Sequence, residues 1–410
     1  MNRKEFLQAL AGATAATAAT AATASAPSVA AAMPSAQGRR PRAIAMWDFS
    51  WLERRWPGAG YENWDLALDE LTERGYDAVR IDAYPHLVAA EPNKSWLLKP
   101  VWDTQDWGAP TLVRVRVLPE LHQFIAKCRD RGVKVGLSTW FREDESEIRR
   151  RISGPEQLAV AWNTTLSGIQ QAGLLDALLY VDLCNEWPGT VWAPFVQPPL
   201  DWGQWFDPRA MAWMGRAVAA VRAEFPSLPL LFSTDNDRVE TIAEQDLHFV
   251  DAIEHHLWMV GENNDEFYEL AGYHYERFSE VGYHNLQLTA ANIYAEKPAY
   301  WQKLLTDKIA RLANASRHAR LPLMTTECWA IVDYKDWPLL PWDWVKEVCA
   351  KGVLTASATG QWMAMATSNF CGPQFQGMWR DINWHRQLTS TIKAGPIDPT
   401  IQSGRLYGRL

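Results

Sequence analysis

The segment Leu179-Tyr-Val-Asp-Leu-Cys-Asn185-Glu186-Trp187-Pro188 is an apolar run that stops abruptly at an adjacent asparagine and glutamate. A second apolar run, Leu321-Pro-Leu-Met-Thr-Thr-Glu327, also stops at a glutamate. Short apolar runs of this kind are typical of buried strands, so we expect each strand to place one carboxylate at its C-terminal end. Hydrolysis of a glycosidic bond requires such a pair, because one carboxyl group protonates the leaving oxygen while the other attacks the anomeric carbon or activates water.

Other extended apolar runs alternate with segments of helical spacing along most of the chain. The expected strands lie at 43–49, 77–83, 134–140, 179–185, 229–234, 249–256, 321–327 and within 352–365. The expected helices lie at 64–74, 118–131, 155–171, 208–224, 238–244, 262–318 (mostly helical) and 342–350. This alternation predicts an α/β fold, a single (β/α)8 TIM barrel whose active site lies at the C-terminal ends of the strands.

Glu186 then follows strand four and Glu327 follows strand seven, and Trp-rich loop insertions are expected after strands two, four and six. An open doubly wound sheet fits less well, because no glycine-rich phosphate loop follows the first strand. We place the catalytic barrel at residues 43–395 and a C-terminal tail at 396–410.

The N-terminus is expected to be an export signal that is not part of the fold. Asn2-Arg-Lys-Glu-Phe-Leu-Gln8 is similar to a twin-arginine signal with lysine as the second basic residue, and Ala30-Ala-Ala32 supplies a cleavage site. Residues 1–32 would be the signal and 33–42 a short linker, so that the mature protein is periplasmic or secreted and has no membrane anchor. Both the twin-arginine and the general secretory routes remain open.

Composition narrows the class of partner. The net charge of −8 argues against nucleic acid, whose binding needs a basic patch. The 23 tryptophans are in excess, and indole rings stack on the C–H faces of sugars while their N–H groups donate hydrogen bonds, which favours a carbohydrate partner. Five cysteines without CxxC or zinc-like spacing indicate neither a disulfide scaffold nor a structural metal site.

These strand-end motifs resemble those of the retaining, cellulase-like glycoside hydrolases of the clan that contains family 5. In those enzymes an Asn-Glu pair, often followed by proline, ends strand four, and here Pro188 is displaced by one residue. The resemblance implies that Glu186 is the general acid/base, that Asn185 binds the sugar 2-hydroxyl, and that Glu327 is the nucleophile. The chain departs from the family pattern after the nucleophile, where it has Cys328-Trp329 in place of an aromatic residue and glycine.

Arg80 matches the strand-two arginine that orients the nucleophile in that family. Its charge is expected to keep Glu327 ionised, while a more desolvated Glu186 stays protonated. The further candidates for substrate binding are Asp48 after strand one, Trp140 after strand three, His256 and Trp258 after strand six, and Trp362 on strand eight, for which Trp379 or Trp384 are alternatives.

The predicted activity is retaining hydrolysis of β-glycosidic bonds in an oligosaccharide or polysaccharide, with no cofactor and no metal. One alternative is a non-catalytic sugar-binding protein on the same barrel, which would not need both glutamates. Another is a metal-dependent hydrolase that uses the histidines with Asp48 or Asp82, but the His-x-His ligand set on strand one that it needs is missing from the sequence.

Overall fold

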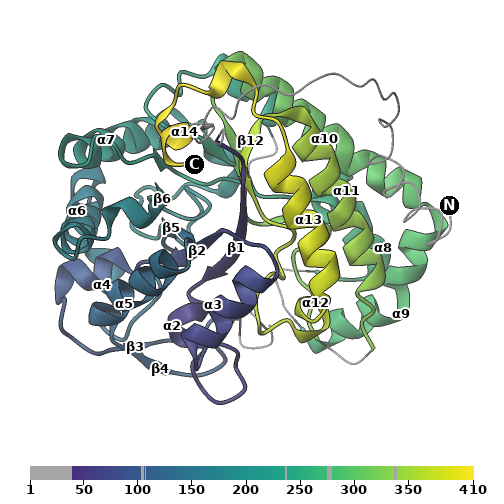
Figure 1. Cartoon of the computed structure of the whole chain (residues 1–410), viewed down its shortest axis with the longest axis horizontal. Coiled ribbons are helices and arrows are strands. Elements are labelled where there is room, and N and C mark those ends of the chain that lie inside the picture. The colour runs from purple at the N-terminus through teal and green to yellow at the C-terminus, as the bar shows by residue number, and fades with distance from the viewer. Residues whose placement is uncertain (1–38, 103–105, 107, 236–237, 275–278, 337–338) are drawn as a thin grey trace, which may run out of the picture. The chain divides into compact units, whose positions relative to one another are not determined.

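A computed structural model describes residues 39–102, 106, 108–235, 238–274, 279–336 and 339–410. The predicted signal at 1–32 and most of the predicted linker lie outside the described residues. Residues 39–410 form one folding unit, in which helices surround a central sheet (Figure 1).

The central sheet has eight strands, all parallel to their neighbours, in the order β7-β6-β5-β2-β1-β12-β10-β8. Their bounds are β1 (Arg42–Asp48), β2 (Ala78–Asp82), β5 (Lys134–Ser138), β6 (Leu178–Asp182), β7 (Leu230–Leu231), β8 (Ile253–Glu254), β10 (Leu323–Thr325) and β12 (Trp362–Met365). Just beyond β7 and β8, Thr234 pairs with His255 in a parallel bridge, and the amide of Thr234 donates to the carbonyl of Glu254 at 3.0 Å. This pairing closes the sheet, which confirms the predicted (β/α)8 barrel.

Each helix that the apolar spacing predicts is present, with one clear difference in length, and the structure adds α13 and several short helices that were not predicted. The longer helices are α3 (Trp64–Glu73), α5 (Val117–Asp130), α6 (Pro155–Gln171), α7 (Pro208–Glu224), α8 (Glu262–Ala271), α9 (Glu280–Glu296), α10 (Pro298–Ala319), α11 (Asp343–Thr359) and α13 (Ile382–Ala394). The shorter ones are α2 (Ser50–Glu53), α4 (Pro85–Ala90), α12 (Gln376–Trp379) and α14 (Arg405–Arg409). In the part of the chain that the structure describes, none of these helices is long and apolar enough to cross a bilayer.

The helix that differs in length is α11, which we predicted to end at Ala350 before a strand that begins near Gly352. The helix instead continues to Thr359, and the strand is shorter. Gly352 is a packing residue here, because a Cβ atom on it would lie 2.7 Å from the indole of Trp329. The glycine therefore allows α11 to lie close to the barrel and does not end the helix.

Two small sheets extend the barrel at its loops. The insertion after β2 contains an antiparallel pair, β3 (Trp96–Leu98) and β4 (Val113–Val115). Beyond β8 and β10, β9 (Leu257–Trp258) pairs in parallel with β11 (Cys328–Trp329). Short 3-10 helices complete the fold: η2 (Ile148–Arg151), η3 (Leu175–Ala177), η4 (Trp202–Gln204), η5 (Val239–Glu244), η6 (Met259–Gly261) and η8 (Pro399–Ile401).

The interior of the barrel is filled by side chains and depends on one glycine. A Cβ atom on Gly136 of β5 would lie 2.4 Å from the ring of Tyr180, on the neighbouring strand β6. Tyr180 is completely buried, so this ring occupies the volume that a side chain at position 136 would need. The small residue on one strand therefore makes room for the large one on the next.

The segment 396–410, predicted to be a tail, is folded against the barrel. Ile401 and Leu406 are buried in one apolar cluster with Ile44 and Tyr180 of the strands. Arg405 pairs with Asp251 at 2.9 Å. The short apolar pattern of this segment gave no periodic signal, and only its contacts with the strands show that it belongs to the barrel.

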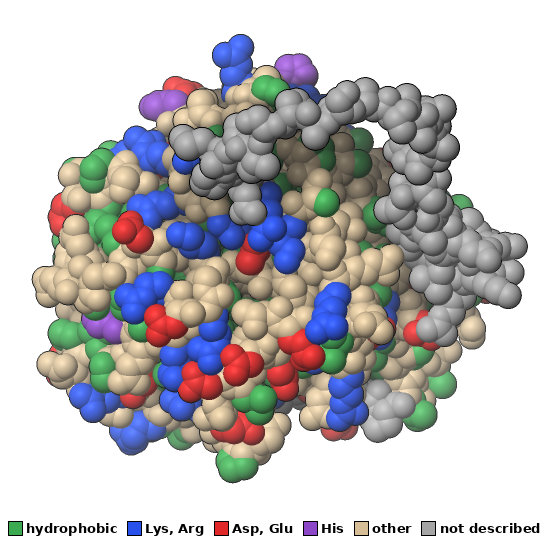
Figure 2. All heavy atoms as spheres, in the orientation of Figure 1, with side chains coloured by type: hydrophobic (Ala, Val, Ile, Leu, Met, Phe, Trp, Pro, Cys, Tyr) green, Lys and Arg blue, Asp and Glu red, His purple; other side chains and the backbone are tan. Residues whose placement is uncertain are grey.

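The five cysteines are all buried free thiols, which agrees with the expectation that they form no disulfide scaffold. On the face that Figure 2 shows, Lys and Arg side chains lie among Asp and Glu side chains. Mixed charge of this kind on that face is typical of a solvated surface.

Replacing Gly136 should destabilise the barrel because the Tyr180 ring leaves no space for a methyl group. We expect Gly136→Ala to lower the free energy of unfolding by about 1–3 kcal/mol, measured by chemical denaturation. Gly404→Ala is the control, because a Cβ atom at position 404 meets no atom within 4 Å. Equal stability of the two variants would contradict this account of the interior.

Candidate active site

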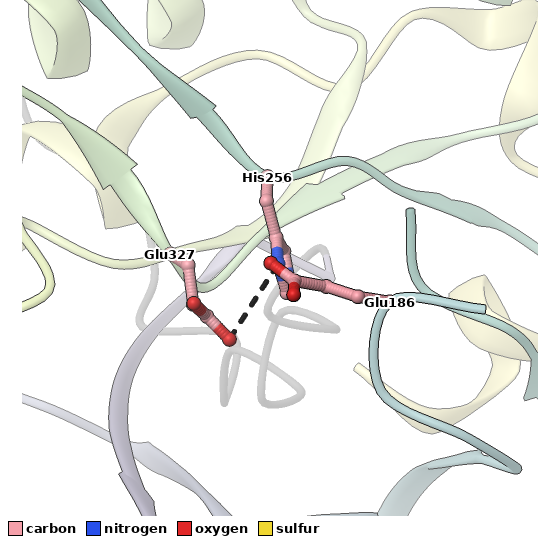
Figure 3. A group of neighbouring side chains, drawn as sticks. All are labelled: Glu186, His256 and Glu327. Atoms are coloured by element: carbon pink, nitrogen blue, oxygen red, sulfur yellow. Dashed lines mark hydrogen bonds and ion pairs between the residues drawn. The ribbon is translucent and has the colours of Figure 1, made fainter. Parts of the chain in front are cut away.

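The two strand-end glutamates face each other at the C-terminal mouth of the barrel. Glu186 follows β6 and Glu327 follows β10, and each is held close to His256, which follows β8. One carboxylate oxygen from each glutamate and one ring nitrogen of the histidine all lie within 4.8 Å of one another. The three side chains point toward one another (Figure 3).

Glu186 is fixed by the strands on both sides of its own. The amide of Asn185 donates to the carbonyl of Thr139 at 2.9 Å, and the amide of Glu186 donates to the hydroxyl of Ser233 at 2.9 Å. Glu186 has a φ of 44°, a left-handed conformation that is unfavourable for a residue other than glycine. Strained backbone of this kind persists where surrounding contacts hold it, and it is enriched at functional sites.

Arg80 of β2 lies at the centre of the buried charges. Its guanidinium is 3.0 Å from a carboxylate oxygen of Asp48 and 3.3 Å from one of Glu327. It also donates to the carboxamide oxygen of Asn185 and to the hydroxyl of Thr326. The structure therefore places Arg80 against the predicted nucleophile, and the same guanidinium orients the asparagine beside the predicted acid/base.

His256 lies between carboxylates at the floor of the site. Its Nδ1 atom is 2.9 Å from Glu186 Oε1 and 3.5 Å from Glu327 Oε1. On the other side of the ring, Nε2 is 2.8 Å from Glu254 Oε2 and 3.1 Å from Arg80 Nη1. The side chain is completely buried and both nitrogens have partners. His256 therefore contacts both glutamates, and it also lines the cleft above them.

The ionisation of this group differs from the order that we predicted. Burial opposes charge on the imidazole, but the carboxylates of Glu254 and Glu327 outweigh it and raise the pKa of His256 well above its usual range. Burial likewise opposes the charge of Glu254, yet the nearby His256 lowers the pKa of Glu254 to about 2. His256 is therefore an imidazolium whose Nε2 atom is paired with the carboxylate of Glu254.

For the pair itself, burial raises the pKa of Glu327 well above its usual range, against the opposing charges of His256 and Arg80. Burial also acts on Glu186, but its hydrogen bond from His256 lowers the pKa of Glu186. These directions favour a proton on Glu327 and charge on Glu186. We predicted the reverse because sequence alone shows the charge of Arg80 but not the closer contact between His256 and Glu186.

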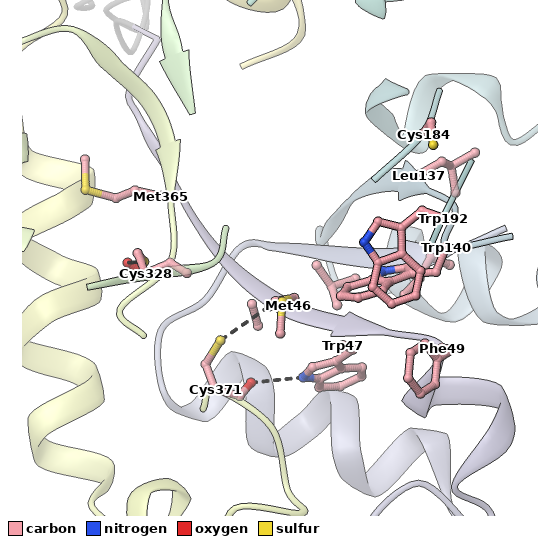
Figure 4. Close-up of a cluster of buried hydrophobic side chains, with 14 of the residues drawn as sticks. Met46, Trp47, Phe49, Leu137, Trp140, Cys184, Trp192, Cys328, Met365 and Cys371 are labelled. Atoms are coloured by element: carbon pink, nitrogen blue, oxygen red, sulfur yellow. Dashed lines mark hydrogen bonds between the residues drawn. The ribbon is translucent and has the colours of Figure 1, made fainter. Parts of the chain in front are cut away.

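A cleft of about 960 Å³ opens over both glutamates. Trp102, Trp140 and Trp192 form one part of its wall, with ring centroids 4.6–5.2 Å apart and edge-to-face. Trp192 also donates its indole N–H to Glu186 Oε2 at 3.0 Å (the ring lies beside Trp140 in Figure 4). Elsewhere the wall is polar, with side chains that include those of Glu262, Asp265, Lys308, Arg311 and Asp333.

Three of the predicted sugar contacts, Trp140, His256 and Trp258, line this cleft. The indole N–H of Trp258 donates to Asn369 at 2.9 Å, which fixes the ring beside His256. Asn185 is buried, and its Nδ2 atom has no hydrogen-bond partner within the described residues.

Two other predicted contacts do not line the cleft. Asp48 is buried and lies 3.0 Å from the guanidinium of Arg80, so it is a counter-charge for the arginine, although burial raises the pKa of Asp48 to about 6. Trp362 is at the first position of β12, is buried, and donates to the hydroxyl of Thr325. It therefore lies at the start of its strand, whereas the glutamates lie beyond the ends of theirs. Trp379 and Trp384 belong to α12 and α13 and do not line the cleft either.

Sequence reasoning missed Glu254, Trp192 and Trp102. Glu254 could have been found, because it lies two residues before His256 on one strand and side chains two apart share a face. The two tryptophans lie in insertions whose path no periodic pattern determines, so their convergence on the cleft needed the structure.

Glu186, His256 and Glu327 also form the one group with metal-ligand spacing among the described residues. A cation fits poorly there, since the guanidinium of Arg80 is 3.3 Å from Glu327 and the imidazolium of His256 has no lone pair to donate. The same holds for a metal role of Asp48, whose carboxylate is already paired with Arg80.

Residues 44–393 match the family model of sugar-binding cellulase-like proteins. A crystal structure from Parabacteroides distasonis ATCC 8503, described as a candidate glycoside hydrolase, is 53% identical, with a TM-score of 0.89 over 91% of this chain and 100% of that one. No curated protein matches the sequence.

Two further structures are far more distant. The cellulose synthase subunit Z of Clostridioides difficile is 12% identical, with a TM-score of 0.48 over 86% of this chain and 99% of that one. A GH5_18 protein from Bifidobacterium longum, in complex with Manβ1-4GlcNAc, is 13% identical, with a TM-score of 0.48 over 87% of this chain and 80% of that one. Neither similarity carries a conclusion about this chain.

Loss of the Arg80 charge should leave several buried carboxylates without compensation. We expect Arg80→Met to lower the free energy of unfolding by about 3–5 kcal/mol near neutral pH. Without the guanidinium the pKa values of the neighbouring carboxyl groups rise in the folded state, so the folded chain binds more protons than the unfolded chain and stability falls as pH rises. Chemical denaturation should therefore show a larger loss at about pH 8 than at about pH 5.

Arg216→Met is the matched control, since Arg216 pairs with Glu156 on the surface and both side chains are more than half exposed. That variant should change stability by less than about 1 kcal/mol at either pH. An Arg80→Met protein as stable as this control would contradict the central role of the guanidinium.

Because the guanidinium of Arg80 and the imidazolium of His256 already lie against the glutamates, the site should not bind zinc. Protein that is incubated with zinc and then desalted should contain far less than one equivalent by elemental mass spectrometry. One zinc per chain, lost on Glu327→Gln, would contradict the charge assignment of His256 and Arg80.

Proposed function

The chain belongs to the sugar-binding cellulase-like family, and we propose that it hydrolyses β-glycosidic bonds of an oligosaccharide or polysaccharide with retention of configuration. The observation that carries this proposal is the approach of Glu186 and Glu327, with oxygens within 4.8 Å, at the floor of one large cleft. Retaining enzymes keep their two carboxyl groups about 5–5.5 Å apart, whereas inverting enzymes leave room for a water between them.

In the proposed reaction Glu327 attacks the anomeric carbon and Glu186 protonates the leaving oxygen. Arg80, 3.3 Å from Glu327, stabilises the carboxylate and holds it toward the sugar. Glu186 then removes a proton from the water that hydrolyses the glycosyl-enzyme. The unpaired amide of Asn185, beside Glu186, suits a hydrogen bond to the sugar 2-hydroxyl.

The cleft walls support a carbohydrate as the substrate. Trp102 and Trp192 offer indole surfaces on the side of Glu186, where the leaving group would sit, because Trp192 itself bonds that carboxylate. Sugars present C–H faces to such rings. The charged residues of α8 and α10, including Glu262 and Lys308, suit the many hydroxyl groups of a bound glycan.

The relative from Parabacteroides distasonis supports the same class of activity, since it is described as a candidate glycoside hydrolase and shares 53% of its residues with this chain. We further propose that the protein is exported, on the grounds of the arginine-lysine pair and the Ala30-Ala-Ala32 site near the N-terminus.

A panel of aryl β-glycosides tests the activity. The wild type should release the chromophore from at least one of the gluco, manno, galacto and xylo substrates. Glu327→Gln should reduce kcat/KM by at least about 10³-fold on that substrate with an unchanged thermal melting temperature, because the amide cannot act as a nucleophile. Glu156→Gln, a change of one exposed glutamate, is the control and should keep full activity.

A Glu327→Gln protein with wild-type activity would remove Glu327 from the mechanism. Saccharide binding without any hydrolysis by the wild type would favour the alternative, a non-catalytic sugar-binding protein on the same barrel.

A further inference from the structure

Glu254 and His256 form, with Glu186, a buried chain that the proposed reaction does not yet use. Glu254 Oε2 contacts His256 Nε2 at 2.8 Å, and His256 Nδ1 contacts Glu186 Oε1 at 2.9 Å. The other oxygen of Glu254 accepts from the amide of Thr326 at 2.8 Å and from its hydroxyl at 2.6 Å. All of these groups except the tip of Glu186 are completely shielded from solvent. Glu254 therefore fixes the ring of His256 at Nε2, and Nδ1 faces Glu186 and Glu327.

These three residues bear on the question of which glutamate of the pair carries the proton. Retaining hydrolysis needs a proton on Glu186 and a negative charge on Glu327, whereas the contact of His256 with Glu186 and the burial of Glu327 favour the opposite arrangement. The proton must therefore move between the two glutamates once a sugar is bound. A sugar whose anomeric carbon lies between the carboxylates blocks the direct path. His256 Nδ1 offers another path, because it lies within 2.9 Å of Glu186 and 3.5 Å of Glu327.

We propose that His256 carries a proton from Glu327 to Glu186 when substrate binds, and that Glu254 is the positioning residue that keeps the ring oriented and charged for this transfer. The inference rests on the proposed glycosidase function. It assigns to this protein a way of setting its acid and its nucleophile that depends on Glu254 of β8 and on His256 just after that strand.

The proton moves from Glu327 to Glu186 in two steps. The Nδ1–H bond of the imidazolium breaks and the proton bonds to Glu186 Oε1, which leaves a neutral ring with a lone pair on Nδ1. The O–H bond of Glu327 then breaks and its proton joins Nδ1. The ring is an imidazolium again, Glu186 is a carboxylic acid and Glu327 is a carboxylate. No other reactant is needed, and the 3.5 Å contact closes by rotation of the Glu327 carboxyl group.

The charges around the ring suit this role. Carboxylates face His256 from three elements: Glu254 from β8, Glu186 from the end of β6 and Glu327 from the end of β10. Arg80 of β2 faces Nε2 at 3.1 Å and opposes the charge of the ring, while Asp48 of β1 offsets Arg80. Glu254 is the carboxylate that contacts the ring but takes no part in bond cleavage. Removing its charge should therefore affect His256 before it affects the reacting pair.

The test compares two leaving groups. We expect His256→Asn, which keeps a donor near Glu186 but cannot carry a proton, to reduce kcat/KM for a phenyl β-glycoside by about 10²–10⁴-fold, as expected for loss of general acid catalysis. The 2,4-dinitrophenyl glycoside of the same sugar leaves without protonation but still needs an ionised Glu327, so it should also lose activity near neutral pH, and this loss should shrink as rising pH removes the proton from Glu327. The loss for the phenyl glycoside, which also needs a proton on Glu186, should not shrink with rising pH. His255→Asn, the adjacent residue on the other face of the strand, is the control and should show neither effect. A loss for the 2,4-dinitrophenyl glycoside that stays constant as the pH rises would overturn the proposal.

Glu254→Gln provides a second test that does not require His256→Asn to fold. Without the Glu254 charge the pKa of His256 falls, so the alkaline limb of the kcat/KM profile should move to lower pH in the folded protein. An unchanged alkaline limb would overturn the role of Glu254. Either failure leaves the proposed function intact if Glu327→Gln is inactive, whereas an active Glu327→Gln protein would refute the function itself.

Discussion

The need to keep Arg80 compensated inside the barrel constrains most of the site. A guanidinium that is 99% shielded from solvent is stable only if carboxylates and acceptors surround it, and here the partners come from four other strand ends. Asp48, Glu254, Glu327 and Asn185 all meet this one group. Because the arginine is fixed on β2, each of these side chains is held in a defined place, and the two glutamates of the cleft are positioned as a consequence.

The same constraint explains why the glutamates differ. Glu186 contacts the ring of His256 and the indole of Trp192, while Glu327 contacts Arg80 and lies deeper in the protein. Two carboxyl groups within 4.8 Å repel each other, so the pair titrates as a unit and holds one proton over a wide range of pH. The surroundings decide which of the two carries it, and a bound sugar changes those surroundings.

The sequence was sufficient for the barrel and for the two glutamates because both depend on local patterns. Apolar runs that alternate with helical spacing predicted all eight strands, and α6 and α7 begin and end at the predicted residues. What it could not predict depends on contacts between distant segments. The order of ionisation in the pair follows from a distance between His256 and Glu186, and the folding of 396–410 follows from its apolar contacts with the strands.

The central claim is that Glu327 forms a covalent bond to the sugar while Glu186 acts as acid and base. The most direct measurement is intact-protein mass spectrometry after incubation with an activated 2-deoxy-2-fluoro-β-glycoside of the best substrate, followed by peptide mapping. The account predicts an added mass of one fluoroglycosyl group per chain, located on Glu327. A label on another residue, or hydrolysis of the natural substrate with inversion and no trapped species, would contradict it.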